Sequence, residues 1–301
     1  MSGNLSASIL ARLLTLAKQR GDDYSLLLNR FAMERLLTRV SVSPHADRFL
    51  LKGALLFALW YDTPHRPTRD ADLLGFGPDD EANLIATFRE VAAMDLRDGI
   101  VFDPASVKAN AIREDNDYGG TRVTLLARIG SARCALQIDV GFGDAVTPGP
   151  QTATFPTLLS DFPAPTLRVY PVYTVIAEKY QAMVMLGQAT SRMKDFFDLA
   201  VIARRTHLDA ATLATAIAAT FARRQTLLPA ERPLALTNQF SEDAAKLRQW
   251  QAFLNKNRIT AGSLGETVAL LDKLLWPPTM TAITNHSTTA TWDPDSVQWH
   301  S

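Results

Sequence analysis

The chain has 301 residues, of which 47% are hydrophobic and 21% are charged, so it is long enough for two domains and apolar enough for a sizeable core. Lysine plus arginine and aspartate plus glutamate both number 31, and the net charge of zero excludes a basic footprint for nucleic acid over the whole chain, although a local basic cleft stays possible. The single cysteine excludes an intrachain disulfide and favours a reducing compartment.

The apolar segments are too short for a protein that spans a membrane. The longest apolar stretch, Gly53 to Tyr61, is far shorter than the roughly 20 residues that cross a bilayer. Arg12, Lys18 and Arg20 interrupt the apolar residues near the N-terminus, which is not typical of a signal peptide. We therefore expect a cytoplasmic protein without membrane contacts.

The first part of the chain alternates helical and extended patterns. Apolar residues recur at helical spacing from Leu5 to Arg20 and from Tyr24 to Ser41, which predicts two helices. Phe49 to Lys52 is a short strand or the start of a helix, and Ala54 to Trp60 has a helical pattern. Asp70 to Gly75 then predicts a strand.

After an amphipathic helix from Asp80 to Asp95, the period changes from helical to alternating. Turn residues at 116–120 and at 130–131 separate the alternating segments. Cys134 falls on an apolar position of this pattern, so we expect it to be buried. The arrangement predicts an antiparallel meander that joins the Asp70 strand. Its strands are 107–112, 121–129 and 133–140.

A loop-rich segment from Gly141 to Pro165 contains five prolines and marks the domain boundary. We expect an α+β domain at 1–165, with a mixed or antiparallel sheet flanked by helices, and a helical-bundle domain at 166–276. Residues 277–301 are rich in Thr, Ser and Asn and predict a flexible tail. The helices expected in the second domain are 175–186, 193–205, 210–223, 242–255 and 264–275.

The pair Asp70 and Asp72 is the first candidate for chemistry. Residues two apart on a strand point to the same face, and adjacent carboxylates repel each other unless a cation lies between them. Oxygen ligands suit Mg²⁺ or Mn²⁺, and nucleotidyl transfer uses such a metal to neutralise a triphosphate and activate the attacking oxygen. An isolated Asp-x-Asp is a weak motif, and it is usually a pair of solvated residues on an exposed strand face.

Other residues support a site for phosphate. Asp139 lies among apolar residues of the last predicted strand, where a charge is costly unless it is paired or bound to a metal. It is therefore a candidate for a third metal ligand. The alternative is a residue at the end of the strand that faces solvent. Lys52, Gly53 and Ala54 precede a predicted helix, where a glycine lets backbone N–H groups approach a phosphate. Arg66 precedes the Asp70 strand and either guides a phosphate or is solvated.

These features resemble the nucleotidyltransferase fold, in which a helix with a glycine-containing start precedes a strand with Asp-x-Asp and a later strand with a third Asp. Four ordered segments resemble, more narrowly, the AbiEii toxin family, the toxin half of AbiE-type toxin–antitoxin and phage-abortive systems. Four motifs in this order are more specific than any one of them. The segments are Leu51–Leu55, Arg69–Leu73, Ile176–Lys179 and Arg192–Leu199.

The resemblance implies a toxin that transfers a nucleoside monophosphate from an NTP to an RNA acceptor, foremost the tRNA 3′ end, and so blocks translation. Asp70 and Asp72 would hold Mg²⁺, and Lys179 would contact the triphosphate from the helical domain. Asp195 would be the late acidic residue of the active-site cleft, and Asp198, three residues on, would be structural. A cognate antitoxin is also implied, and we expect a monomer.

Some features keep other functions open. Ala54 stands where the family often has Ser or Gly, so backbone amides would have to bind the phosphate. This departure and the neutral charge leave open a non-catalytic nucleotide- or partner-binding module, and the metal site alone does not exclude a protein acceptor. The arginine pairs at 204–205 and 223–224 form an RNA-binding rim or simply complement helix dipoles.

Overall fold

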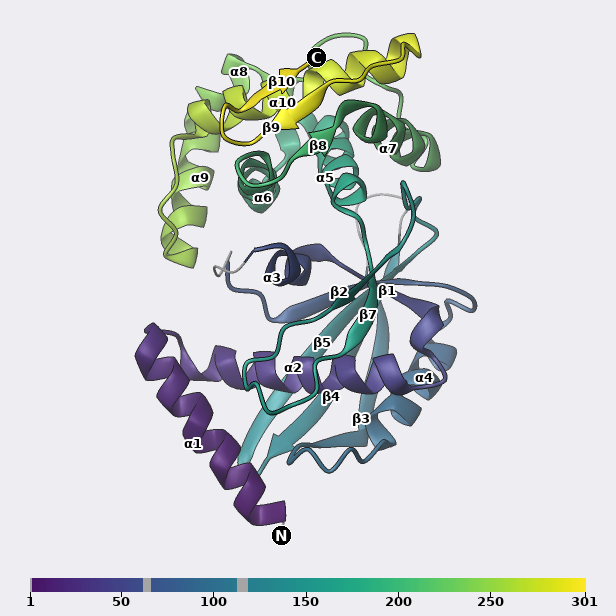
Figure 1. Ribbon diagram of the computed structural model, residues 1–301, viewed down its shortest axis with the longest axis vertical. Coiled ribbons are helices and arrows are strands. Elements are labelled where there is room, and N and C mark those ends of the chain that lie inside the picture. Colours follow the sequence, from purple (N-terminus) through teal and green to yellow (C-terminus); the bar gives the residue numbers. More distant parts are fainter. Residues whose placement is uncertain (1, 62–65, 113–118) are drawn as a thin grey trace. The chain divides into compact units, whose positions relative to one another are not determined.

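The computed structural model describes residues 2–61, 66–112 and 119–301, so part of the turn expected at 116–120 lies outside the described residues. The chain forms two compact units (Figure 1). The first consists of Met1–Gly143 and Gln151–Tyr170, and the second of Asp144–Pro150 and Pro171–Ser301. The division after Tyr170 lies close to the boundary expected at 165, but residues 144–150 join the second unit.

The first unit is built on a mixed sheet of seven strands in the order β3-β4-β5-β2-β1-β7-β6. The antiparallel meander is confirmed, and its last strand, β5, runs parallel to β2. Strand β6 lies in the segment 141–165 that we expected to be loop, and β7 lies just after it, at the start of the part that we expected to be helical. Each has only four residues, which is too short for a clear alternating pattern. The strands are β1 (Phe49–Lys52), β2 (Asp70–Gly75), β3 (Val101–Ile112), β4 (Gly120–Ile129), β5 (Ala132–Phe142), β6 (Gln151–Thr154) and β7 (Thr166–Val169).

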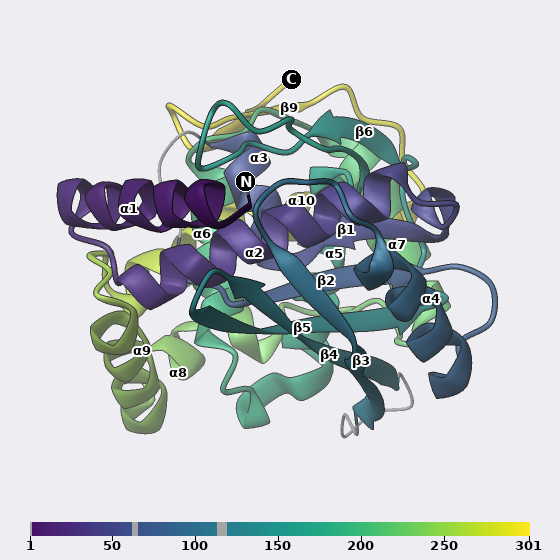
Figure 2. The same cartoon turned by 90° about the horizontal axis from the view of Figure 1, so that it is seen from below.

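Helices cover one face of this sheet, as Figure 2 shows for α1, α2 and α4. Alternate residues of β5 point to this face, and Cys134, Leu136 and Ile138 on it are at most 2% exposed. The opposite face of β5 carries polar residues. The helical elements of this unit are α1 (Ser2–Arg20), α2 (Tyr24–Val42), η1 (Ala46–Arg48), η2 (Gly53–Leu56), α3 (Phe57–Trp60) and α4 (Glu81–Ala93).

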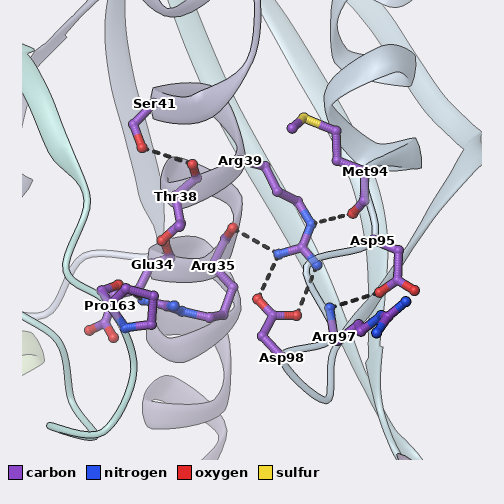
Figure 3. Close-up of polar contacts among 10 residues, drawn as sticks. All are labelled: Glu34, Arg35, Thr38, Arg39, Ser41, Met94, Asp95, Arg97, Asp98 and Pro163. Atoms are coloured by element: carbon purple, nitrogen blue, oxygen red, sulfur yellow. Dashed lines mark hydrogen bonds and ion pairs between the residues drawn. The ribbon is translucent and has the colours of Figure 1, made fainter.

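Helix α2 places charged side chains in the core of this unit (Figure 3). Arg39 donates to both oxygens of Asp98, at 2.8 and 2.9 Å, and to the carbonyl oxygen of Met94 at 2.9 Å. Arg35 donates to the carbonyl oxygen of Pro163 at 3.0 Å. These bonds tie α2 to two loops, and a buried bidentate ion pair makes the loss of either partner costly.

Glu34 is a second buried charge of α2, with 1% of its surface exposed. Its Oε2 accepts a hydrogen bond from the backbone N–H of Leu158 at 3.0 Å, and Oε1 lies 3.4 Å from Arg30 Nε. Burial raises the pKa of Glu34 from 4.5 to about 7, against the opposing effect of these partners. Because the folded state holds this proton more tightly, Glu34 favours folding below pH 4.5 and loses that contribution as the pH rises through about 7.

The substitution Glu34→Gln is therefore expected to flatten the pH dependence of stability. The shift in the pKa of Glu34 corresponds to about 3 kcal/mol, so the wild type should lose about that much more unfolding free energy than the variant as the pH rises. Urea unfolding over this pH range measures the difference. The same change at the exposed Glu231 is the control and should leave the profile unaltered, whereas parallel profiles for wild type and Glu34→Gln would contradict the assignment.

The second unit has the helical character that the sequence predicts, with a small three-stranded sheet added. No helix among the residues described in either unit has both the length and the hydropathy to cross a membrane. The elements of the second unit are α5 (Val172–Leu186), η3 (Gly187–Ala189), α6 (Met193–Ala203), β8 (Leu208–Asp209), α7 (Ala210–Arg223), η4 (Leu234–Leu236), α8 (Asn238–Ser241), α9 (Ala244–Asn257), α10 (Leu264–Thr284), β9 (Thr291–Asp293) and β10 (Gln298–His300).

Pro277 and Pro278 lie inside α10, which we expected to end before them. A proline has no N–H to donate to the carbonyl oxygen four residues earlier, so the helix leaves the carbonyls of Lys273 and Leu274 without that partner. Trp299 Nε1 donates to these two oxygens, at 3.0 and 3.3 Å. A side chain from β10 thus replaces the missing donors, and the helix continues through both prolines.

The expectation of a flexible tail from residue 277 does not hold. After α10, strand β9 pairs with β8 and β10, and Trp292 on β9 is fully buried. Trp292 Nε1 donates to the carbonyl oxygen of Ala203 at 2.6 Å, and its ring lies 5.4 Å from that of Trp299. The polar composition of this segment predicts disorder, but two tryptophans anchor it to the helices.

Candidate active site

A row of polar residues crosses the sheet of the first unit, one residue from each of five adjacent strands. Lys52 pairs with Asp72, Asp72 with Asp139, Asp139 with Arg122, and Arg122 with Asn110. Directly paired residues point to the same face, so this row places two carboxylates between two cations. The face is the one opposite to the buried residues of β5.

Asp70 lies two residues before Asp72 on β2 and shares its face, as the alternation predicts. Asp70 pairs with Gln137 on β5, next to the pair of Asp72 and Asp139. Both aspartates are partly exposed. The strand therefore presents two carboxylates side by side, which is the arrangement that favours a cation between them.

Gly53 packs against Asp72 and starts not a regular helix but a 3₁₀ turn, Gly53–Leu56, before the short helix α3. Its φ of +72° is in the left-handed region that favours glycine. A Cβ atom on Gly53 would lie 1.9 Å from Asp72 Oδ2, a distance that no side chain can tolerate. The glycine is thus needed for the position of the Asp72 carboxylate. Ala54 follows it and is half-buried.

Asp139 lies beside Asp72, but its carboxylate is bound to Arg122. Arg122 Nε and Nη2 donate to Asp139 Oδ1 and Oδ2 at 2.9 and 2.8 Å, in the bidentate geometry that guanidinium groups form with carboxylates. Gln137 Nε2 lies 3.3 and 3.4 Å from the same two oxygens. Both oxygens of Asp139 therefore accept hydrogen bonds from protein side chains.

The charges around Arg122 stabilise its protonated form. The hydrogen bond to Asp139 raises the pKa of the Arg122 guanidinium, and the negative charges of Asp139, Asp70 and Asp72 add to this effect. Arg122 is nevertheless 43% exposed, and Asp139 is 21% exposed. The guanidinium of Arg122 is thus a permanent and partly accessible positive charge on the face that carries these aspartates.

A divalent metal fits this face through Asp70 and Asp72. Mg²⁺ is commonly held by one or two carboxylates, with water and substrate phosphates completing its six ligands. Over residues 2–61, 66–112 and 119–301, no group of three or more His, Cys, Asp or Glu side chains is placed to hold a metal ion. Asp70 and Asp72 are therefore the two carboxylates of this face that would hold such a metal.

The other residues expected at this site lie around it. Lys52 ends β1, and its Nζ lies 5.6 Å from the ring centre of Tyr170. Arg66 is half-buried in the segment that leads into β2. Lys52 thus pairs directly with Asp72 in the polar row. Arg66 is near the site in sequence, four residues before Asp70.

Lys179, Asp195 and Asp198 come together in the second unit. Lys179 Nζ on α5 donates to Asp195 Oδ1 at 2.6 Å and to Asp198 Oδ2 at 2.8 Å, both on α6. Arg192 Nε donates to the other oxygen of Asp195 at 2.6 Å. The two aspartates are at most 1% exposed and Lys179 is 13% exposed, so one lysine joins both candidate late acids.

The protonation states of this cluster follow from its pairing. Burial by itself lowers the pKa of Lys179, but the carboxylates of Asp195 and Asp198 outweigh it and raise the pKa above its ordinary value. Burial likewise acts to raise the pKa of Asp195, and the charges of Lys179 and Arg192 reverse the shift and lower it. Lys179 and Asp195 are therefore both charged at neutral pH.

The arginine pairs of the helical half differ in their surroundings. Arg224 donates to Asp144 Oδ1 through Nε and Nη2, at 3.3 and 3.0 Å, and to Gln181 at 3.0 Å. Asp144, whose side chain is 8% exposed, is thus an ion-pair partner of Arg224. Arg204 and Arg223 are exposed. The guanidinium of Arg224 is bound to residues of its own unit, which weakens the expectation that the pair 223–224 forms part of an RNA-binding rim.

Sequence reasoning missed Arg122 and Gln137 as residues of this face. The signal was present, because a two-residue turn at Gly130–Ser131 sets the register of β4 against β5 and places Arg122 opposite Asp139. Gln137 precedes Asp139 by two residues and therefore shares its face. Counting outward from the turn would have found both residues.

Comparisons with known proteins give a family match and two structures of similar fold. Residues 35–268 match the family described as nucleotidyl transferase AbiEii toxin of type IV toxin–antitoxin systems. The crystal structure of JHP933 from Helicobacter pylori is similar, with a TM-score of 0.50 and 14% identity over 87% of this chain and 95% of that one. Another H. pylori crystal structure, of a provisionally assigned nucleotidyltransferase, has a TM-score of 0.49 and 15% identity over 88% of this chain and 100% of that one. No curated protein matches the sequence significantly.

Proposed function

This chain belongs to the AbiEii family of nucleotidyl transferase toxins of type IV toxin–antitoxin systems, and from that premise we propose that it transfers a nucleoside monophosphate from an NTP to an RNA acceptor. The tRNA 3′ end is the acceptor that we propose, because its modification would block translation. The family implies an antitoxin partner and an NTP substrate.

The observation that carries the proposal is the pair Asp70 and Asp72 on the polar face of β2, with Gly53 packed against Asp72. In the proposed reaction these two carboxylates hold Mg²⁺ or Mn²⁺. A bound metal of this kind neutralises charge on the triphosphate and activates the attacking oxygen. Gly53 keeps the Asp72 carboxylate in place, and Lys52 and Ala54 on either side of it face the phosphates with a side-chain ammonium and a backbone N–H.

Lys179 and three further residues are also given roles in this proposal. The ammonium group of Lys179 has three N–H donors, and two of them bind Asp195 and Asp198. The third N–H binds a phosphate of the NTP, and Asp195 keeps the lysine in its charged form. Asp198 also accepts a hydrogen bond from Lys179, at 2.8 Å against 2.6 Å for Asp195, so it shares this supporting role. Arg66 is proposed to guide the triphosphate.

Incubation of the protein with each labelled NTP, Mg²⁺ and total tRNA tests the proposal. The substitution Asp72→Asn is expected to reduce transfer by more than about 100-fold, since losing a residue that merely orients a metal ligand already costs 10- to 100-fold. The exposed Asp79 provides the matched control, because Asp79→Asn removes the same charge outside the polar row. Undiminished transfer by Asp72→Asn would exclude this mechanism.

The same assay separates the alternatives. Binding of an NTP without transfer to any RNA would favour a non-catalytic nucleotide-binding module, to which the alanine at position 54 points. A protein acceptor would appear as a mass increase of one nucleotide on a partner protein when RNA is absent. Transfer to tRNA that depends on Asp72 would contradict both alternatives.

A further inference from the structure

We propose that Arg122 binds a phosphate group of the substrate beside the Asp70 and Asp72 pair, and that Asp139 holds Arg122 in position for this task. The inference rests on the proposed function and names a binding residue within it. It also assigns to Asp139 a role other than the third metal ligand that the fold resemblance implies. Asp139 is then a positioning residue, and Arg122 is the group that touches substrate.

The hydrogen bonds of Asp139 carry the first part of the argument. Both of its oxygens accept from Arg122, at 2.9 and 2.8 Å, and Gln137 lies within 3.4 Å of each. Gln137 and Asp139 share a face of β5, and Arg122 pairs directly with Asp139 on β4. A metal ion at Asp139 would have to displace a bidentate charged partner, which is among the strongest side-chain interactions.

The hydrogen bonds of Arg122 carry the second part. A guanidinium has five N–H donors, and the pair with Asp139 occupies Nε and one N–H of Nη2. Within the described part of the chain, Nη1 makes no hydrogen bond, and 43% of the side chain is exposed. The planar group, fixed along one edge by a carboxylate, presents its other edge outward. This is the fork that binds two oxygens of a phosphate.

The charges on the sheet indicate why a phosphate would bind there. Arg122 pairs with Asp139 and Asp139 pairs with Asp72, so Arg122 lies on the same face as the carboxylates that hold the metal in the proposed reaction, two strands from Asp72. A triphosphate bound to that metal brings several negative oxygens to the same place. A phosphate of the RNA acceptor has the same chemistry, and separate measurements with nucleotide and RNA distinguish the two sources.

Three variants test the inference, namely Arg122→Ala, Asp139→Asn and the double variant. Affinities are measured by calorimetry for the magnesium complexes of ATP, GTP, CTP and UTP, and separately for tRNA without nucleotide. We expect each single variant to weaken binding of one of these ligand types by about 10-fold, because a charge-assisted bidentate contact is lost. The double variant should bind no more weakly than Arg122→Ala, because Asp139 acts through Arg122.

A measurement of metal binding distinguishes the two roles of Asp139. Titration with Mn²⁺, followed by electron paramagnetic resonance, should give the same affinity for wild type and Asp139→Asn, and a weaker one for Asp72→Asn. Arg128→Ala is the control for Arg122→Ala, since Arg128 lies on the same face of β4 and is paired with Arg133 instead of an aspartate. It should leave all affinities unchanged, and circular dichroism establishes that each variant is folded.

Several results would overturn the inference. These are loss of Mn²⁺ binding in Asp139→Asn, tighter nucleotide binding by that variant, or unchanged affinity for nucleotide and tRNA in Arg122→Ala. The outcome is separable from that of the proposed function. Transfer that is insensitive to Arg122 would sustain the function and overturn the inference, whereas binding that depends on Arg122 without transfer would do the reverse. Absence of both binding and transfer in the wild type would overturn both.

Discussion

The substitution Gly53→Ala is expected to reduce nucleotide transfer by about 100-fold or more, although it adds a single methyl group. The added Cβ would lie 1.9 Å from Asp72 Oδ2 and 2.6 Å from its Cγ, so the carboxylate has to move. Displacing a catalytic group by about 1 Å can cost about 100-fold in rate. Steady-state transfer assays with saturating NTP and RNA measure the effect.

Gly21→Ala is the matched control for this prediction. Gly21 has a φ of +69°, nearly that of Gly53, but a Cβ on it would meet no atom within 4 Å. Both variants therefore carry the same backbone strain, about 1–2 kcal/mol, and only Gly53→Ala collides with Asp72. Thermal unfolding should show a small loss for Gly21→Ala and a loss at least as large for Gly53→Ala, and transfer should fall only for Gly53→Ala. An equal loss of transfer in both would indicate a general effect of strain.

The substitution Lys179→Met is expected to destabilise the second unit by about 3–5 kcal/mol, apart from any effect on transfer. Lys179 donates to two carboxylates that are at most 1% exposed, and its removal takes from both the cation that they share, although Asp195 keeps its bond to Arg192. Breaking a buried ion pair by removing one partner has a cost of this size. Urea unfolding of wild type and variant at neutral pH measures it.

Lys194→Met is the control, because Lys194 is exposed one residue before Asp195 on the same helix. Its effect should stay within about 0.5 kcal/mol, as for most surface substitutions. Adding Asp198→Asn to Lys179→Met should recover part of the lost stability, since it removes one of the two buried carboxylate charges that Lys179 had paired. If Lys179→Met unfolds at the wild-type urea concentration, the lysine does not stabilise the fold and serves substrate alone.

Local pattern was sufficient for much of the first unit. Alternation predicted the three strands of the meander and placed Asp70 and Asp72 on one face, because a strand has a side-chain period of two whatever its neighbours are. The turn at Gly130–Ser131 also determines that Arg122 pairs with Asp139, since a short hairpin sets the register of its two strands. These features depend on residues close together in the chain.

Contacts between distant segments decided the rest. The approach of Gly53 to Asp72, the pairing of β7 with β1, and the two bonds of Lys179 join residues that no local period relates. Pro277 was expected to end a helix, because a proline leaves a carbonyl without its donor, and this expectation failed because Trp299 supplies a donor from 22 positions further along. The sequence therefore indicates which groups need partners, and only the tertiary structure decides which partners they find, because a buried polar group is satisfied by any donor or acceptor that packing brings within reach.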